Sequence, residues 1–197
     1  MSVSKFFLWF GMMFPLMFSP GPANVTLAAM GGRFGFRKSL PFIAGVNLIV
    51  LLHALLIGFG ALQFLEAYPA LFALIQPAGA LYLVYLAFRF LKSSKIGANG
   101  NTGLPRFWDG FMLGLLNAKV VTLTMVMFSQ VLDNESGKLL QVVTFSIGLA
   151  LLTTGATLTW AAGGAWLTRK LASPKVLKLQ GYVFGSMLLG VAVWMLI

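Results

Sequence analysis

The hydrophobic positions of this chain fall into six long runs that short polar segments separate. The runs cover residues 6–30, 40–65, 71–91, 107–132, 139–167 and 176–197. A helix needs about 20 consecutive apolar residues to cross the hydrocarbon core of a bilayer, and each run is at least that long. The pattern therefore predicts an all-α integral membrane protein with six transmembrane helices.

Helix-breaking residues interrupt the first and the fourth run. The first contains Ser-Pro-Gly-Pro-Ala-Asn at residues 19–24, and the fourth contains Asn-Ala-Lys at residues 117–119. A proline inside a helix removes a hydrogen bond and clashes with the preceding turn. In a bilayer such a break persists only where protein or a water-filled cavity supplies partners for the backbone. Because paired breaks in two halves of a membrane protein indicate a transport site, we predict broken helices 1 and 4 around such a site.

A stretch rich in Gly, Asn and Ser divides the six runs into two sets of three. We expect a first three-helix repeat over residues 1–92, a cytoplasmic linker over residues 93–105 and a second three-helix repeat over residues 106–197. Because three is odd, the second repeat is inverted relative to the first. The halves share no identity above chance, so this prediction depends on the number of runs and on the paired breaks.

Basic residues are concentrated in the segments that follow the first, third and fifth runs. They are Arg33, Arg37, Lys38, Arg89, Lys92, Lys95, Arg106, Arg169, Lys170, Lys175 and Lys178. By the positive-inside rule, loops 1–2, 3–4 and 5–6 face the cytoplasm of a cell (inner) membrane, and both termini lie outside. If the first run turned back at its break, the N-terminus would instead lie inside.

Composition agrees with a membrane protein and excludes other classes. The chain is 59% hydrophobic and 9% charged, whereas about a quarter of the residues of a soluble domain are charged. Its net charge of +10 does not indicate nucleic acid, because the basic residues flank apolar runs. Without cysteine there are no thiolate metal sites or cysteine nucleophiles, and we expect no metal or other cofactor.

Polar residues inside the runs are candidates for binding a substrate. A helix that restarts near Asn24 would present its positive N-terminal end to a carboxylate, unless the break is a kink satisfied by neighbouring helices. Asn24 and Asn117 either cap helix ends or contact a zwitterion. Burying a charge as deep in a span as that of Lys119 costs on the order of 3 kcal/mol. The lysine therefore has one of three roles: it holds a substrate carboxylate, it takes part in coupling, or it binds the C-terminal end of the helix before the first break.

The remaining titratable residues limit the coupling mechanisms and the substrates that the chain can support. His53 is the one histidine and lies in the second run, where it is either a proton relay or a neutral hydrogen-bonding group. The four carboxylates, Glu66, Asp109, Asp133 and Glu135, all fall at the ends of runs. A central acidic proton carrier and a divalent-cation exporter, which needs clustered ligands, are therefore disfavoured.

Residues 20–24 read PGPAN and are followed by Gly31, Gly35, Arg37 and Lys38. Together with three further segments, they resemble the LysE/RhtB family of amino-acid exporters. Residues 110–119, GFMLGLLNAK, are similar to the family's Gly-x-x-x-x-Leu-Leu-Asn-Pro-Lys, and residues 79–87 to its Gly-x-x-Tyr-Leu-x-Tyr-Leu-Gly. The glycine-spaced last run, from residue 181 to 190 and onward, is similar to the family's closing helix. The resemblance covers the whole chain.

Two departures from the family pattern change the expected site. Ala118 replaces the family's proline, so we expect a softer break in the fourth run, which can be as little as a bend. Lysine and arginine exporters of the family carry acidic residues near the positions of Asn47 and Thr122, so the resemblance implies a neutral substrate. The predicted substrate-binding residues are Pro20, Gly21, Pro22, Asn24, Asn47, Tyr82, Asn117 and Lys119, and the coupling candidates are Lys119 and His53.

We therefore expect a secondary transporter, not an enzyme, that exports a small neutral amino acid by alternating access, driven by the proton-motive force. The alternatives are an exporter of another small solute or cation and a non-transporting membrane scaffold. An intramembrane enzyme would need a nucleophile and base that the runs do not offer. Glycines four residues apart, at 31/35, 110/114 and 181/185, predict close helix packing within the bundle or across a homodimer.

Overall fold

The computed structural model describes residues 3–61, 74, 77–88, 104–132, 137–170, 182, 186, 189–190 and 192–193. Helices make up nearly all of these residues, and there is no strand among them, which confirms the all-α prediction. The labelled helices are α1 (Val3–Phe18), α2 (Pro22–Phe34), α3 (Phe36–Leu56), α6 (Phe107–Leu115), α7 (Ala118–Val131) and α8 (Lys138–Lys170). A π-helical turn, Ile57–Ala61, extends α3, and a shorter apolar helix covers Pro77–Phe88.

Two helices are long and apolar enough to cross a membrane alone, Phe36–Gly60 and Lys138–Thr168. Two bent pairs qualify when each pair is taken together: Ser4–Phe18 with Pro22–Phe34, and Phe107–Leu115 with Ala118–Val131. The described residues therefore hold two to four spans, which correspond to the first, second, fourth and fifth predicted runs. Most of the predicted linker and much of the third and sixth runs lie outside the described residues.

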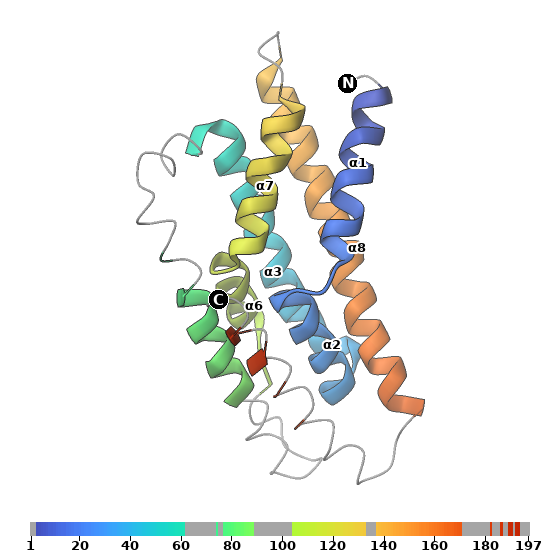
Figure 1. Ribbon diagram of the computed structural model, residues 1–197. Coiled ribbons are helices and arrows are strands. Elements are labelled where there is room, and N and C mark those ends of the chain that lie inside the picture. The colour runs from blue at the N-terminus through green and yellow to red at the C-terminus, as the bar shows by residue number, and fades with distance from the viewer. Residues whose placement is uncertain are drawn as a thin grey trace.

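Both predicted breaks are present, and they lie at mid-height in the bundle (Figure 1). The axes of α1 and α2 differ by 53°, and those of α6 and α7 by 58°. Because α2 continues away from the N-terminus toward the opposite end, the first segment does not turn back (Figure 1). The second helix begins at Pro22, two residues before the expected restart, because a proline in the first turn lacks only an N–H that would be unpaired there anyway.

The expectation of a softer second break is wrong. The chain leaves helical geometry at Leu116 (φ −90°, ψ 13°) and Asn117 (φ −91°, ψ 89°) without any proline. Asparagine competes poorly inside a helix because its side chain favours turns and caps, so the Leu-Asn step alone can end α6. The second break is consequently at least as sharp as the first.

Direct backbone contact joins α2 to α8. A Cβ atom on Gly31 of α2 would overlap the carbonyl oxygen of Ala161 on α8, and one on Gly164 of α8 would overlap that of Ala28 on α2. Such contact requires glycine, the residue that lets two helices in a membrane approach most closely. Gly31 therefore packs within the bundle.

The same kind of contact joins α3 to α6. A Cβ atom on Gly45 of α3 would overlap the carbonyl oxygen of Phe107, and one on Gly110 of α6 would overlap that of Phe42. Gly110 thus also packs within the bundle, whereas residues 181 and 185 lie outside the described residues. In each of the two crossings, a helix from the first half of the sequence contacts one from the second half.

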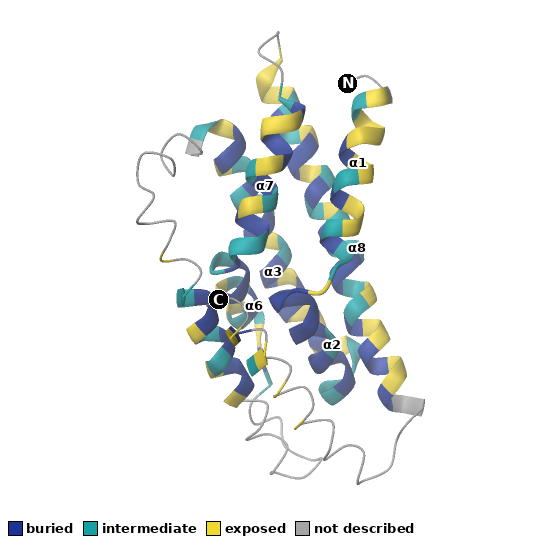
Figure 2. Ribbon diagram, viewed as in Figure 1, coloured by how far each residue is buried: buried dark blue, intermediate teal, exposed yellow. Residues whose placement is uncertain are grey.

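At the end of the bundle that holds α1 and α7, the contacts run through large side chains. The ring of Trp9 covers Gly148 of α8, and Trp9 Nε1 donates to Met127 Sδ of α7 at 3.1 Å. Figure 2 shows buried residues along the inner faces and exposed residues on the outside. Many of the exposed side chains are large and apolar, such as Phe7, Leu140 and Leu151, as expected of a surface that faces lipid.

Candidate functional site

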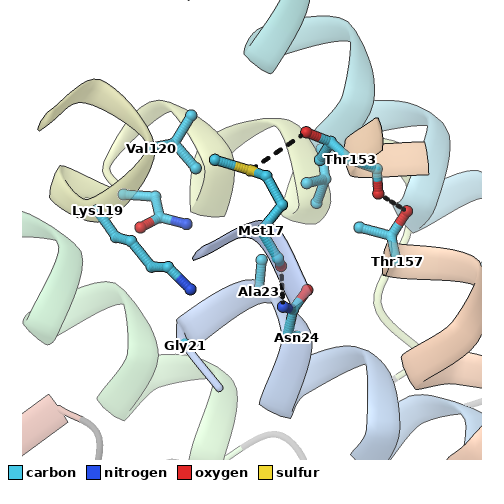
Figure 3. Close-up of a pocket in the computed structure, with 10 residues that line it drawn as sticks. Met17, Gly21, Ala23, Asn24, Lys119, Val120, Thr153 and Thr157 are labelled. Carbon is cyan, nitrogen blue, oxygen red and sulfur yellow. Dashed lines mark hydrogen bonds between the residues drawn. The ribbon is translucent and has the colours of Figure 1, made fainter. Parts of the chain in front are cut away.

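The two breaks meet at a small cavity of about 30 Å³ (Figure 3). The end of α1, the starts of α2 and α7 and the middles of α3 and α8 line it, through Met17, Gly21, Ala23, Asn24, Val46, Asn117, Lys119, Val120, Thr153 and Thr157. A buried water occupies on the order of 10–15 Å³ by this measure, so the cavity has room for about two waters.

The carbonyl groups at the end of α1, residues 15–19, all accept hydrogen bonds from protein. Ser19 donates its backbone N–H to Pro15 O at 2.9 Å and its hydroxyl to Leu16 O at 2.7 Å. Asn24 Nδ2 donates to Met17 O at 2.8 Å and to Ser19 O at 2.9 Å. Trp160 Nε1 donates to Phe18 O at 3.0 Å. Unpaired carbonyls at a helix end in lipid each cost free energy. The first break is therefore satisfied on its carbonyl side.

Asn24 supplies two of these hydrogen bonds while its side chain also lines the cavity (Figure 3). Replacing Asn24 with leucine should lower the melting temperature of the purified protein, at a cost of about 1–3 kcal/mol, because the Met17 carbonyl loses its partner. Thermal unfolding in detergent measures this. Thr159→Val, at an exposed position of α8, is the control, and equal melting temperatures for the two variants would contradict the capping role.

Lys119 connects the two breaks. It is the second residue of α7, and its Nζ donates to Ser19 Oγ at 2.8 Å and to Ser19 O at 3.1 Å, with Pro20 O at 3.5 Å. A Cβ atom on Gly21 would lie 3.1 Å from both Cδ and Nζ of Lys119, so the glycine leaves space for the lysine. Of the roles that the sequence left open for Lys119, the structure shows the contact with the end of α1 and places the side chain at the cavity wall.

The starts of α2 and α7 differ from the end of α1, because neither has a side-chain cap. Gly21 has no side chain to offer, and Asn117 makes no capping hydrogen bond although it is only 3% exposed. Asn117 Oδ1 is buried without a partner among the described residues. Free amides and the helix dipole make each start electropositive, and together with Lys119 they make this side of the cavity rich in donors.

Threonines of α8 form the opposite side (Figure 3). Asn47 of α3 lies behind them, where its Nδ2 donates to Thr157 Oγ1 at 3.2 Å. Thr153 Oγ1 lies 3.5 Å from Met17 Sδ. The sequence did not assign Thr153 or Thr157 to the site, and the available signal was two threonines four residues apart within an apolar run.

The predicted site residues separate into three groups. Four line the cavity: Gly21, Asn24, Asn117 and Lys119. Three lie next to it: Pro20 is exposed in the break, Pro22 is buried at the start of α2, and Asn47 contacts Thr157. Two lie away from its lining: His53, whose Nδ1 has no partner among the described residues, and Tyr82.

The position of Tyr82 corrects the sequence-based prediction. Its hydroxyl lies 3.3 Å from both the backbone oxygen and Oδ1 of Asp109, in the first turn of α6. The helix Pro77–Phe88 lies beside α6 (Figure 1). Tyr82 therefore contacts the first turn of α6 and does not line the cavity.

Comparison with known proteins shows the family to which the chain belongs. The family model described as LysE type translocator matches residues 14–197. The chain belongs to the LysE type translocator family. The resemblance that the sequence motifs indicated is thereby confirmed, and this LysE type translocator is a multi-pass membrane protein of the transporter class.

Curated relatives of this LysE type translocator include the cysteine/O-acetylserine efflux proteins of Salmonella choleraesuis (strain SC-B67) and Escherichia coli O1:K1 / APEC. Each is 30% identical to it over 146 residues, which cover 74% of this chain and 75% of the relative. No solved structure matches the translocator.

Proposed function

We propose that this protein is a secondary transporter that exports a small, neutral amino acid from the cytoplasm. The observation that carries the proposal is the convergence of Lys119 and two uncapped helix starts on one cavity between the breaks. Broken helices whose electropositive ends face a site at mid-height are typical of transporters that bind anionic groups.

The donor-rich side of the cavity suits a carboxylate. A carboxylate accepts hydrogen bonds through two oxygens, and bonds that involve charged groups are stronger than neutral ones. Lys119 and the first amides of α2 and α7 supply such donors. In this proposal a bound carboxylate takes over Lys119 Nζ from Ser19, which couples binding to the relative position of the two breaks.

A neutral substrate fits the charges at the site. Asp109 is the one acidic residue in the part of the chain that the structure describes, and it lies in the first turn of α6, away from the cavity lining. A second positive charge on the substrate would therefore meet Lys119 without a compensating carboxylate. Cysteine and O-acetylserine, which the relatives export by name, are small and neutral, and we place the substrate in that class.

Orientation and driving force complete the proposal. The end of the bundle where α2 and α8 finish and α3 and α6 begin carries Arg33, Arg37, Lys38 and Arg106, so we assign it to the cytoplasmic side of the inner membrane (Figure 1). His53 and Lys119 lie inside the described spans and not in the first or last turn of a span, and we propose them as candidates for coupling to the proton-motive force.

Counterflow in proteoliposomes tests the proposal. Vesicles preloaded with unlabelled cysteine, O-acetylserine, homoserine, threonine or leucine should accumulate labelled amino acid, whereas vesicles preloaded with lysine should not. Protein-free vesicles are the control. If correctly folded protein exchanges none of the neutral amino acids, the exporter assignment is wrong. If lysine drives exchange as well as they do, the neutral class is wrong.

A further inference from the structure

The α8 side of the cavity offers acceptors only. A threonine hydroxyl has one proton to donate, and both cavity threonines donate it to their own helix. Thr153 Oγ1 donates to Leu149 O at 2.7 Å, and Thr157 Oγ1 donates to Thr153 O at 2.9 Å. Both side chains are less than one-tenth exposed, so little solvent competes for their lone pairs.

Asn47 lies next to the cavity lining and occupies one of the two lone pairs of Thr157 Oγ1, which leaves the other as an acceptor. Its Nδ2 has two protons, and they go to Ile43 O at 2.9 Å and to Thr157 Oγ1 at 3.2 Å. The remaining polar atom, Oδ1, is a buried acceptor without a partner among the described residues. A buried acceptor without a donor is costly in a low-dielectric interior, unless a ligand or water supplies the proton.

The charged donor Lys119 and the threonine acceptors therefore lie at opposite ends of one cavity, and one further acceptor, Asn117 Oδ1, lies on the Lys119 side. Figure 3 shows Lys119 and Gly21 on one side and Thr153 and Thr157 on the other, with Met17 and Ala23 between them. An α-amino acid has the complementary arrangement, because its carboxylate only accepts hydrogen bonds and its ammonium group only donates them.

We infer that the cavity binds its substrate in one orientation, with the carboxylate at Lys119 and the ammonium group on Thr153 Oγ1 and Thr157 Oγ1. The two threonines then determine specificity by requiring a free α-ammonium group. Asn47 is a positioning residue that holds Thr157 Oγ1 in place. This assignment rests on the proposed function, since it concerns how the exported amino acid is recognised.

Substrate analogues that lack one of the two charged groups test the orientation. Unlabelled L-cysteine, N-acetyl-L-cysteine and L-cysteinamide are compared as inhibitors of labelled L-cysteine counterflow. The first compound has both groups, the second lacks the ammonium group and the third lacks the carboxylate. For the wild-type protein, N-acetylation should weaken inhibition by about 10-fold or more, because hydrogen bonds to a charged group are lost.

Threonine variants then locate the ammonium group. The double variant Thr153→Val and Thr157→Val should weaken inhibition by L-cysteine and by L-cysteinamide about 10-fold, and should leave N-acetyl-L-cysteine unchanged. The matched control is Thr154→Val with Thr159→Val, whose hydroxyls also donate to the α8 backbone but do not line the cavity. Thr153→Ser with Thr157→Ser keeps the acceptor oxygens and should restore most of the inhibition by L-cysteine and L-cysteinamide that the valine pair loses.

The possible results distinguish a wrong orientation from a wrong function. Equal weakening of all three inhibitors by the valine pair, or no weakening of any, overturns the orientation. If the valine pair does not fold, potent inhibition of the wild-type protein by N-acetyl-L-cysteine overturns it as well. Absence of counterflow with every amino acid overturns the proposed function itself, and this inference with it.

Discussion

Replacing Lys119 with methionine should reduce amino-acid counterflow by about 100-fold or more, the largest effect that we expect of any single change at the cavity. Methionine fills similar space and is tolerated in lipid, but it offers no proton and no charge to a carboxylate. The helix starts of α2 and α7 remain, so residual binding of the carboxylate depends on backbone amides alone. Initial rates of counterflow, with an amount of protein matched by quantification, measure the effect.

Two controls separate binding from structure. Lys138→Met removes an exposed lysine at the start of α8, far along the chain from both breaks, and should leave transport unchanged. Ser19→Ala removes the hydroxyl contact at 2.8 Å but keeps the ammonium group of Lys119, so it should retain most of the transport. If Lys119→Met transports at the wild-type rate and only melts earlier, the lysine is a purely structural link between the breaks.

The residues at the breaks could be predicted from the sequence because their signal is local. Two prolines around a glycine cannot continue a helix in any tertiary context, and a lysine in the middle of an apolar run is costly wherever the run packs. Pro20, Gly21 and Lys119 therefore stand out in the sequence alone. The second break is sharper than the sequence predicts, because it depends on the backbone torsions of Leu116 and Asn117 and not on a proline.

The other side of the cavity could not be predicted, because it depends on which helix faces meet. Thr153 and Thr157 are two of several threonines in α8, and only the packing of α8 against the breaks brings this pair to the cavity. Tyr82 shows the opposite case, a residue that the sequence assigned to the site but that does not line the cavity. It lies in a segment that resembles a family motif, yet the neighbouring helix α6 determines where its hydroxyl goes.

The packing also bears on how the cavity can open. The closest backbone contacts pair α2 with α8 and α3 with α6, so each pair combines helices from both halves of the sequence. Contacts between backbones deform less than contacts between long side chains. We therefore expect each pair to move as a unit, and the large side chains near α1 and α7, such as Trp9, to rearrange more easily.

Replacing Gly164 with alanine should destabilise the folded protein by about 1–3 kcal/mol or more, because the added methyl group overlaps the carbonyl oxygen of Ala28. That oxygen belongs to the backbone of α2 and cannot turn aside as a side chain would. Helices α2 and α8 must separate, which also displaces Gly21, Ala23 and Asn24 from the cavity wall. The fraction of monodisperse protein after extraction and its melting temperature measure the loss.

The neighbouring glycine is a matched control for this prediction. Gly163 is exposed on the same helix, and a Cβ atom there has nothing within 4 Å among the described residues. Gly163→Ala should fold as well as the wild type or slightly better, since alanine favours a helix by about 1 kcal/mol over glycine. Because the two variants differ only in which face of α8 receives the methyl group, equal melting temperatures would show that α2 and α8 are not in backbone contact in the membrane protein as purified.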